Sequence, residues 1–110
     1  MSFSLEDLIK AIEEGIEGAK VKIVDKRCNL LAVTVGDDIF LVHFGRCRVK
    51  GMVYVKVMLG HIVPRWSCDI IDYIPYGYYI FGDKLNEIVN KLKGRMNVLK
   101  KLSSSIELQV

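Results

Sequence analysis

Near its amino end the chain repeats apolar residues every three or four positions, from Ser4 to Gly18. Charged side chains occupy most of the positions between them, so one side of the segment is apolar and the other is polar, which is typical of a surface helix. Ser4 and Asp7 are spaced for mutual capping at its start, and Gly18 suits its end. The pattern predicts an amino-terminal helix over 4–18.

A second helical pattern occupies the carboxyl part of the chain. It begins after Asp83, which can cap a helix, and runs to Leu102, where the serines at 103–105 predict a break before a short tail. An apolar stripe follows this helix and is formed by Leu85, Ile88, Leu92, Leu99 and Leu102. Such a stripe is typical either of pairing between two copies of the helix or of packing on the domain's own sheet.

Between the two helices the pattern changes to a period of two, which is typical of β-strands. We predict strands at 19–26, 29–35 and 39–44, each rich in Val, Ile or Leu. The tripeptide at 36–38, Gly-Asp-Asp, predicts a hairpin turn, because Gly and Asp tolerate the positive φ angles that tight turns need. Residues 46–59 also alternate and predict one further strand.

The segment after that strand is less regular. Pro64 has no backbone N–H to donate to a sheet, so we expect an edge or a loop at 61–69. The aromatic stretch at 73–82 fits either a fifth strand or a connection. Together these patterns predict an α+β fold with an amino-terminal helix, an antiparallel sheet of about four or five strands and a long carboxyl-terminal helix. Residues 1–82 would form the helix and sheet core, and 83–110 the last helix and tail, within one domain.

Length and composition limit the class of protein. A chain of 110 residues supports a single core, and hydrophobic and charged fractions of 51% and 26% are ordinary for a folded domain. No apolar run approaches the length of about 20 residues that spans a bilayer, and the amino end lacks a signal-peptide pattern. We therefore expect a cytoplasmic protein. Abundant Lys, Glu, Ile and Val with a single Gln suggest a thermophilic source.

Residues that carry chemistry are sparse. Cys28, Cys47 and Cys68 are odd in number and widely spaced, which predicts reduced thiols rather than a disulfide framework. No Cys-x-x-Cys pair accompanies the two histidines, so a zinc site is not indicated. His43 lies in an apolar strand and is interpreted as structural. Since no P-loop or dinucleotide-binding loop occurs either, we predict neither catalysis nor a cofactor.

The stretch RCRVKGMVYVKVML, at 46–59, has the most informative polar pattern. Read as one strand bent at Gly51, it places aliphatic residues on one side and Tyr54 with the cations on the other. Those cations are Arg46, Arg48, Lys50 and Lys56. Alternate side chains lie about 7 Å apart, which is compatible with successive phosphates of a flexible single strand. Residues 46–66 contain no Asp or Glu, an imbalance that solubility alone does not require.

This pattern favours a surface for single-stranded nucleic acid, with DNA expected before RNA. Aromatic rings beside a cationic groove stack on unpaired bases without demanding a sequence. The predicted binding residues are Lys20, Lys22, Arg46, Arg48, Lys50, Tyr54, Lys56, Arg65, Trp66, Tyr76 and Tyr78. The competing interpretation is that the aromatic residues belong to the core or form cross-strand pairs.

In layout the chain resembles the ThermoDBP family, the single-stranded DNA-binding proteins of some heat-loving archaea. The resemblance lies in the helix at 4–18, the strands at 19–59 that include RCRVK, and the heptad leucines Leu85, Leu92 and Leu99. It implies a small antiparallel sheet whose basic and aromatic cleft takes up single strands without a zinc site. It also implies a homodimer or a higher homo-oligomer, formed through a leucine-zipper-like last helix.

Two other classes of function stay open at this point. A small dimeric interaction protein would use the leucine-rich helix and an exposed strand edge without binding nucleic acid. Arg95 on the leucine seam and Gly94 beside it weaken a zipper. An enzyme of unrecognised class would draw on His43, His61 or Cys68.

Overall fold

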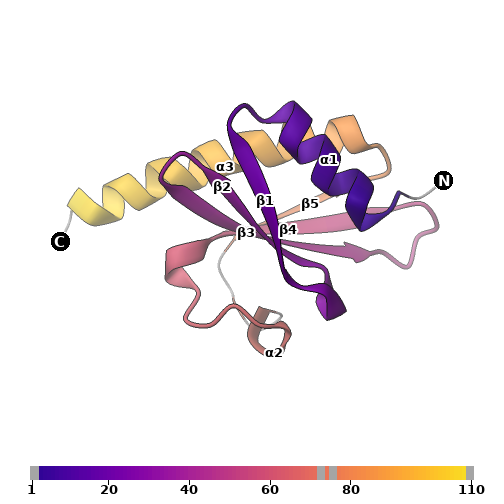
Figure 1. Ribbon diagram of the computed structural model, residues 1–110, viewed down its shortest axis with the longest axis horizontal. Helices are drawn as coiled ribbons and strands as arrows, with labels where there is room; N and C mark the ends of the chain where they lie inside the picture. Colours follow the sequence, from indigo (N-terminus) through magenta and orange to yellow (C-terminus); the bar gives the residue numbers. More distant parts are fainter. Residues whose placement is uncertain (1–2, 72–73, 75–76, 109–110) are drawn as a thin grey trace.

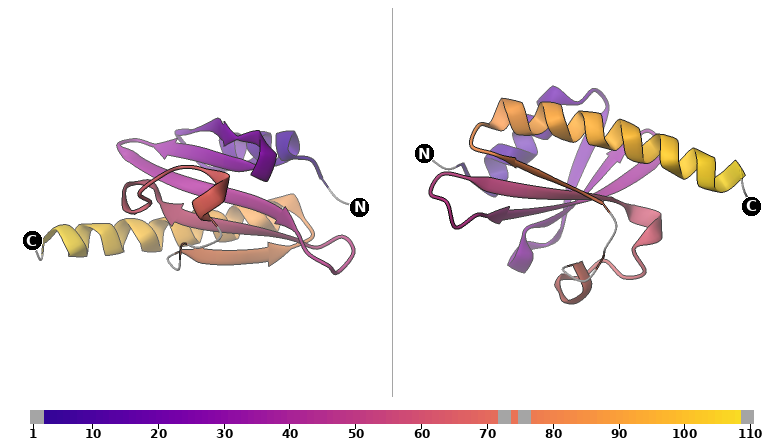
Figure 2. Two further views of the ribbon diagram at one scale, coloured as in Figure 1. Left: turned by 90° about the horizontal axis from the view of Figure 1, so that it is seen from below. Right: turned by 180° about the vertical axis from the view of Figure 1, so that it is seen from behind.

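The computed structural model describes residues 3–71, 74 and 77–108. They form one five-stranded antiparallel sheet, with two amphipathic helices on one face and a short irregular segment on the other (Figures 1 and 2). The predicted α+β fold is confirmed. The helices are α1 (Leu5–Gly15), α2 (Cys68–Ile71) and α3 (Leu85–Leu108), with 3-10 turns η1 (Lys26–Cys28) and η2 (Gly60–Ile62). The strands are β1 (Ala19–Asp25), β2 (Leu30–Val35), β3 (Asp38–Arg46), β4 (Val53–Leu59) and β5 (Tyr78–Gly82).

The strands follow one another across the sheet in chain order, so the sheet is a meander with β1 and β5 as its edges. The predicted hairpin joins β2 to β3, where Val35 pairs with Asp38 and Gly36 adopts a φ of 61°. Glycine suits this position because a Cβ makes positive φ costly. The aromatic stretch before α3 supplies β5, so the alternative of a fifth strand is correct from Tyr78 onward.

The start of α1 follows its sequence signals. The Asp7 N–H donates to Ser4 Oγ (3.1 Å) and the Ser4 N–H donates to Asp7 Oδ2 (3.0 Å), which completes the predicted capping box. The apolar side of the helix buries Leu8 against the sheet. On another side, Glu13 Oε2 accepts a hydrogen bond from the Val21 N–H (3.1 Å), so α1 also covers part of the β1 edge.

The helices α1 and α3 pack against each other on the same face of the sheet (Figure 2). α1 ends at Gly15 rather than at Gly18, and Gly18 turns the chain into β1 with a φ of 79°. A Cβ at Gly15 would lie only 2.7 Å from Val89 Cγ1. Glycine at this position therefore allows the close approach of the two helices, because a larger residue would push them apart.

The last helix is longer than its sequence predicts. α3 continues to Leu108 through the serines at 103–105, where the pattern predicts a break. Serine has a middling helix propensity, and neither proline nor glycine follows these serines to stop the helix. In the described part of the chain, no helix is both long and apolar enough to cross a membrane.

The apolar stripe of α3 packs on the chain's own sheet. Ile88 and Leu92 are completely buried and Leu99 nearly so, all in the core between the helices and the sheet. Leu85 is partly buried against the same core. The prediction that Ile88, Leu92 and Leu99 form a dimerisation seam is therefore wrong, since burial within one chain leaves them no surface for a partner. Leu102 differs, because it is exposed.

The opposite face of the sheet is covered by the chain between β4 and β5. We call residues 60–71 and 74 the cover; it contains η2, a loop and α2, and lies across the sheet from α1 and α3 (Figures 1 and 2). The predicted loop at 61–69 is thus confirmed for much of this segment. A second, smaller apolar cluster holds the cover to the sheet and consists of Leu30, Ala32, Leu41, Met58, Val63, Ile71 and Ile74.

The predicted single strand at 46–59 is wrong. Arg46 ends β3, a turn follows in which Gly51 has a φ of 84°, and β4 begins at Val53. Arg46 and Val53 are cross-strand partners and therefore lie on the same face, the one that α1 and α3 cover. Tyr54 points to the opposite face. Arg46 and Tyr54, which one continuous strand would place together, are thus separated by the sheet.

Candidate nucleic-acid interface

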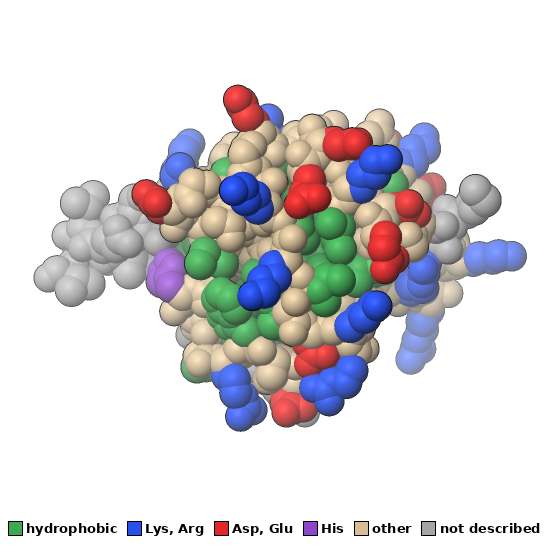
Figure 3. Space-filling model, in the orientation of Figure 1, with side chains coloured by type: hydrophobic (Ala, Val, Ile, Leu, Met, Phe, Trp, Pro, Cys, Tyr) green, Lys and Arg blue, Asp and Glu red, His purple; other side chains and the backbone are tan. Residues whose placement is uncertain are grey.

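The three cations at the start of the predicted binding strand lie around the tip of the β3–β4 hairpin. Arg46 donates from Nη2 to the Phe3 carbonyl (3.2 Å), and its guanidinium carbon lies 5.7 Å from the centroid of the Phe44 ring. Arg48 and Lys50 are exposed in the turn. Lys and Arg side chains also project at the end of the molecule where Figure 1 places this hairpin (Figure 3). These cations form a projecting group rather than a row along a strand.

Lys56 is buried, contrary to its predicted role on an open surface. Only 3% of the residue is exposed, because the cover lies over it. Its ammonium donates to the backbone carbonyls of Ile71 (3.4 Å) and Ile74, and lies 5.4 Å from the centroid of the Tyr79 ring. Lys56 is therefore closed to ligands while the cover is in place.

Lys20 and Lys22 lie far from the predicted tyrosines Tyr54 and Tyr78. Lys22 is in register with Ala32, Leu41 and Met58 on the three following strands, so it belongs to the face that the cover partly occupies. Both lysines are exposed on β1, whereas Tyr54 is on β4 and Tyr78 on β5. Strand spacings of about 4.8 Å place β1 and β5 roughly 19 Å apart. The two lysines and the aromatic residues do not form one compact site.

The remaining predicted residues divide among several positions. Trp66 donates from Nε1 to the Gly60 carbonyl (3.0 Å), so the ring has a structural contact within the cover, and Arg65 beside it is exposed. Tyr78 is half-buried on the helix face beneath Arg95, whose guanidinium carbon is 4.8 Å from its ring centroid. Tyr76 lies outside the described residues.

The structure places Tyr54 in a group of rings that we call the aromatic row, with Tyr79 and Phe81. Cross-strand pairing brings Tyr54 opposite Phe81, and the Tyr54 and Tyr79 centroids are 6.0 Å apart. Tyr79 and Phe81 are stacked, with centroids 6.1 Å apart and planes at 16°, and are 53% and 52% exposed. Gly45 makes room for the row, because a Cβ there would lie 2.3 Å from the Tyr54 ring.

Tyr79 and Phe81 are functional candidates that the predicted binding residues omit. Their signal in the sequence is the alternation in Tyr78-Tyr79-Ile80-Phe81, where Ile80 turns into the core and its two neighbours turn to the other face. This alternation is informative only once β5 is known to be a strand. Two large aromatic residues more than half exposed beside each other are unusual for a purely structural role.

An open groove follows the outer edge of β5, between this strand and α3. We call it the edge groove; its volume is about 570 Å³, and its lining residues are Tyr79, Ile80, Phe81, Lys91, Gly94, Arg95 and Val98. Lys91 donates from Nζ to the Phe81 carbonyl (3.4 Å), so this carbonyl faces the groove rather than β4. Among the described residues, the lining contains two cations and no carboxylate. An anion beside the exposed rings would therefore meet favourable charge.

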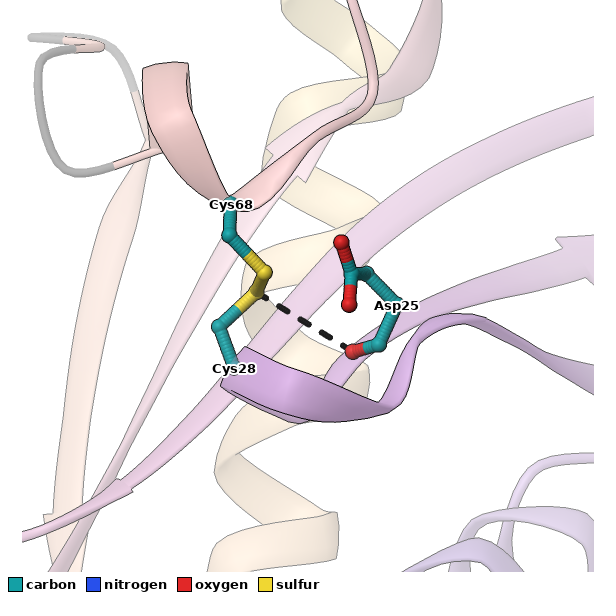
Figure 4. A group of neighbouring side chains, drawn as sticks. All are labelled: Asp25, Cys28 and Cys68. Carbon is teal, nitrogen blue, oxygen red and sulfur yellow. Dashed lines mark hydrogen bonds between the residues drawn. A yellow bond between two sulfur atoms is a disulfide. The ribbon is translucent and has the colours of Figure 1, made fainter.

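A disulfide joins Cys28 in η1 to Cys68 at the start of α2, with a Cα–Cα distance of 5.8 Å (Figure 4). The prediction that all thiols are reduced is therefore wrong; the fold brings together two cysteines that are 40 positions apart in the sequence. Cys47 is free.

Asp25 lies beside this disulfide (Figure 4). Its carboxylate accepts hydrogen bonds from the side chain and backbone N–H of Arg27, which lower the pKa of Asp25 below its ordinary value of 3.8. The donor atoms of Asp25, Cys28 and Cys68 lie within 4.8 Å of one another, as metal ligands can. In this form the group is a crosslink, because metal binding requires thiolates and both sulfur atoms are bonded to each other.

No family model, curated protein or solved structure matches the chain. The resemblance to the ThermoDBP family therefore stays a prediction. On the side of the molecule seen in Figure 3, cationic and anionic side chains alternate over much of the surface, so overall charge does not define an interface there. The interface has to be argued from the aromatic row and the edge groove.

Proposed function

We propose that this protein binds single-stranded nucleic acid, DNA in the first instance, through the aromatic row and the edge groove. The observation that carries the proposal is the exposed, stacked pair Tyr79 and Phe81 on the edge strand. Each residue is about half exposed beside a groove lined by Lys91 and Arg95. This is the combination that unpaired bases and their phosphates require.

The binding mode follows from the chemistry of the two surfaces. Bases that stack on Tyr79 and Phe81 would each contribute roughly 1–3 kcal/mol, with little dependence on sequence because every base has a flat face. Lys91 and Arg95 would contact phosphates on the groove side of β5. The exposed cations Arg48 and Lys50 at the hairpin tip extend the positive charge. Bases within a duplex are stacked on one another, so single strands should bind more tightly.

Fluorescence anisotropy with a labelled oligothymidylate tests the proposal. The parent protein should bind the single strand more tightly than a duplex of the same length, and more weakly as salt rises, since phosphate contacts release counterions. Replacing Tyr79 and Phe81 by Ala should weaken binding about tenfold or more, the equivalent of one or two lost stacks. Arg95→Ala should reduce the salt dependence by about one phosphate contact.

Matched controls separate this site from general surface effects. Ile23→Ala removes an exposed apolar side chain and Lys22→Ala removes an exposed cation, both from β1 at the far edge of the sheet. Both should leave the affinity unchanged. If the Tyr79 and Phe81 double variant binds as tightly as the parent, the aromatic row is not the site.

Association of two copies is part of the proposal, but through a different surface from the buried leucine stripe. Val98 and Leu102 are exposed apolar residues on α3, and Val98 also lines the edge groove. A homodimer that covers them would hide apolar surface without disturbing the core. Light scattering of the parent and of a Val98→Asp, Leu102→Asp variant tests this point; a monomeric parent contradicts it.

A cytoplasmic location and a thermophilic, archaeal source also belong to this proposal. The disulfide is compatible with them, because intracellular proteins of hyperthermophiles are an exception to the rule that cytoplasmic thiols stay reduced.

The alternative function is protein recognition at the same edge. It is favoured by β5 being an edge strand whose Phe81 carbonyl faces outward, which offers hydrogen bonds to an added strand. A dimer that gives no salt-dependent oligonucleotide signal would support this alternative over nucleic-acid binding.

A further inference from the structure

We propose that reduction of the Cys28–Cys68 disulfide creates a binding site for a thiophilic divalent cation, of which zinc fits best. The ligands would be the two freed thiolates and the carboxylate of Asp25, a set that we call the cysteine–aspartate site. Their donor atoms already lie within 4.8 Å of one another in the oxidised protein (Figure 4). The site uses residues outside the aromatic row and the edge groove, so it does not depend on nucleic-acid binding.

Two of the three ligands come from a single turn. Asp25 precedes η1 and Cys28 ends it, and residues three apart on a 3-10 turn project on the same side. Structural zinc sites use this separation in their Cys-x-x-Cys pairs, and here a carboxylate takes the place of the first thiolate. The turn is also tied to β3 by a contact that does not involve the disulfide, because the Phe44 N–H donates to the Asn29 carbonyl (3.1 Å). Asp25 and Cys28 should therefore keep their relative positions after reduction.

The third ligand, Cys68, is held near the turn by the neighbouring part of the cover. It begins α2, and Ile71 in the same helix is completely buried in the apolar cluster on this face of the sheet. Two positions before Cys68, Trp66 donates from Nε1 to the carbonyl of Gly60, which directly follows β4 (3.0 Å). These contacts do not require the disulfide, so Cys68 should remain beside the turn when the disulfide is broken.

The spacing of the two cysteines suits a tetrahedral ion. Zinc–sulfur bonds of about 2.3 Å place two thiolates on one ion roughly 3.8 Å apart. The Cα–Cα distance of 5.8 Å allows this separation by rotation of the side chains, with little movement of the backbone. Thiolates favour zinc over magnesium or calcium, and three protein ligands leave a fourth position for a water molecule.

Asp25 has the contacts of an oriented ligand. Its Oδ1 accepts the backbone N–H of Arg27 (3.0 Å), a bond that metal binding would leave intact and that fixes the direction of the carboxylate. The Arg27 guanidinium donates to both carboxylate oxygens, from Nε (3.1 Å) and Nη2 (2.8 Å). The Arg27 side chain is 79% exposed and that of Asp25 only 16%. The guanidinium can therefore move into solvent and leave Oδ2 to the ion, at little cost for so exposed a pair.

Thiol–disulfide exchange with a dithiol reductant would open the site. One thiolate of the reductant attacks a sulfur atom of the disulfide, and the other cysteine leaves and takes up a proton. The second thiol of the reductant then displaces the remaining cysteine, so the dithiol becomes a disulfide while Cys28 and Cys68 gain two electrons and two protons. Zinc replaces these two protons, because thiolates and not thiols bind it. Both cysteines are partly exposed, so the reductant and the ion can reach them.

Zinc titration of the full chain tests the site. In a Cys47→Ser background, which removes the free thiol, the protein is reduced with dithiothreitol, separated from it under nitrogen and titrated against a chromophoric zinc indicator. One zinc ion per chain should bind, about 100-fold or more tightly than to the oxidised protein, which has no thiolates. Cobalt should give the near-ultraviolet charge-transfer band of a thiolate complex. If neither ion binds while a thiol assay finds both cysteines free, the proposal is overturned.

Single substitutions identify the ligands. Cys28→Ser and Cys68→Ser should each weaken zinc binding about 100-fold or more, and Asp25→Asn, which keeps an oxygen for the turn, about tenfold or more. Asp37→Asn is the matched control, because this exposed carboxylate lies in the β2–β3 turn at the other end of β2, and its affinity should equal that of the parent. Parent-like affinity in Asp25→Asn or in either serine variant would overturn the proposed ligand set.

Amide hydrogen exchange shows whether the reduced protein keeps the fold that the site needs. In the reduced, zinc-loaded protein, peptides from α1, α3 and η1 should be as protected as in the oxidised parent. Adding a chelator should lower the protection of η1 and leave that of α1 and α3 unchanged. If reduction removes the protection of α1 and α3 and zinc does not restore it, the disulfide is needed for folding and the proposal fails.

Discussion

The two faces of the sheet are covered by different means. On one face α1 and α3 bury a continuous core, in which Leu8, Ile12, Ile88 and Leu92 are completely enclosed. On the other, the described part of the cover contributes to a smaller apolar cluster, and a disulfide and the hydrogen bonds of a buried lysine accompany it. The first face is stabilised mainly by apolar burial, whereas the second also depends on specific polar and covalent contacts. Reduction can break the disulfide on the second face, whereas it leaves the apolar burial on the first face unchanged.

The largest effect is expected on the helix-covered face. Leu92→Ala removes a completely buried side chain and leaves a cavity between α3 and the sheet, which should lower the free energy of unfolding by about 2–5 kcal/mol. Urea denaturation should show one cooperative transition at a lower midpoint. If the midpoint changes as little as for Leu102→Ala, an exposed residue of the same helix, the helix face does not dominate stability.

Removing the crosslink should rank second. The Cys28→Ser, Cys68→Ser variant frees a chain segment that the disulfide closes, and crosslinks of this kind contribute about 2–4 kcal/mol. Thermal unfolding followed by circular dichroism measures the loss. Cys47→Ser is the matched control, because this cysteine forms no disulfide. A loss no greater than that of the control would contradict the role assigned to the second face.

A smaller effect is expected at the floor of the aromatic row. Gly45→Ala places a methyl group where the Tyr54 ring now lies, and crowding of this kind costs about 1–3 kcal/mol. The Tyr54 ring should move, which changes its near-ultraviolet circular dichroism and weakens oligonucleotide binding. Gly94→Ala is the control for the spectrum alone, since nothing lies within 4 Å of the added Cβ but this glycine lines the edge groove. If the near-ultraviolet circular dichroism of Gly45→Ala matches that of the parent, Gly45 does not make room for the Tyr54 ring.

The smallest mutational effect is expected at the α1 cap. Ser4→Ala removes one half of the capping box and should lower the free energy of unfolding by about 1 kcal/mol. The backbone hydrogen bond from Ser4 lowers the pKa of Asp7 below 3.8 in the folded protein. The resulting stabilisation is fully present above the unfolded pKa and is lost as pH falls through the folded value.

The acid dependence of stability therefore includes one group near each face, Asp7 at the α1 cap and Asp25 beside the disulfide. Asp7→Asn and Asp25→Asn should each reduce the loss of stability below pH 3.8, measured by urea midpoints from neutral to acidic pH. If the urea midpoint falls as steeply towards acidic pH in both variants as in the parent, these assignments are contradicted.

Local patterns in the sequence predict the helix-covered face well. The capping box at Ser4 and Asp7 and the turn at Gly36 are formed by neighbouring residues. The stripe of α3 predicts a buried side correctly but not what buries it, because a chain's own sheet and a second helix require the same apolar spacing. Burial of Ile88 and Leu92 in the chain's own core decides between them.

The second face could not be predicted in the same way, because its contacts join distant positions. Arg46 and Tyr54 fall on different faces since the turn around Gly51 changes the alternation, and the length of a turn is weakly encoded in composition. Burial of Lys56 depends on carbonyls of residues 71 and 74, and pairing of Cys28 with Cys68 depends on the path of the cover. The alternation of Tyr79 and Phe81 becomes meaningful only after β5 is assigned.

The two sheet edges differ as well, and this sets a limit on assembly. Glu13 of α1 accepts the Val21 N–H on β1, so an approaching strand would have to displace this helix side chain. At β5 a flexible lysine, Lys91, reaches the Phe81 carbonyl. A molecule that can add a strand on one side alone stops growing after two copies have joined, which prevents open-ended fibres while still permitting a pair.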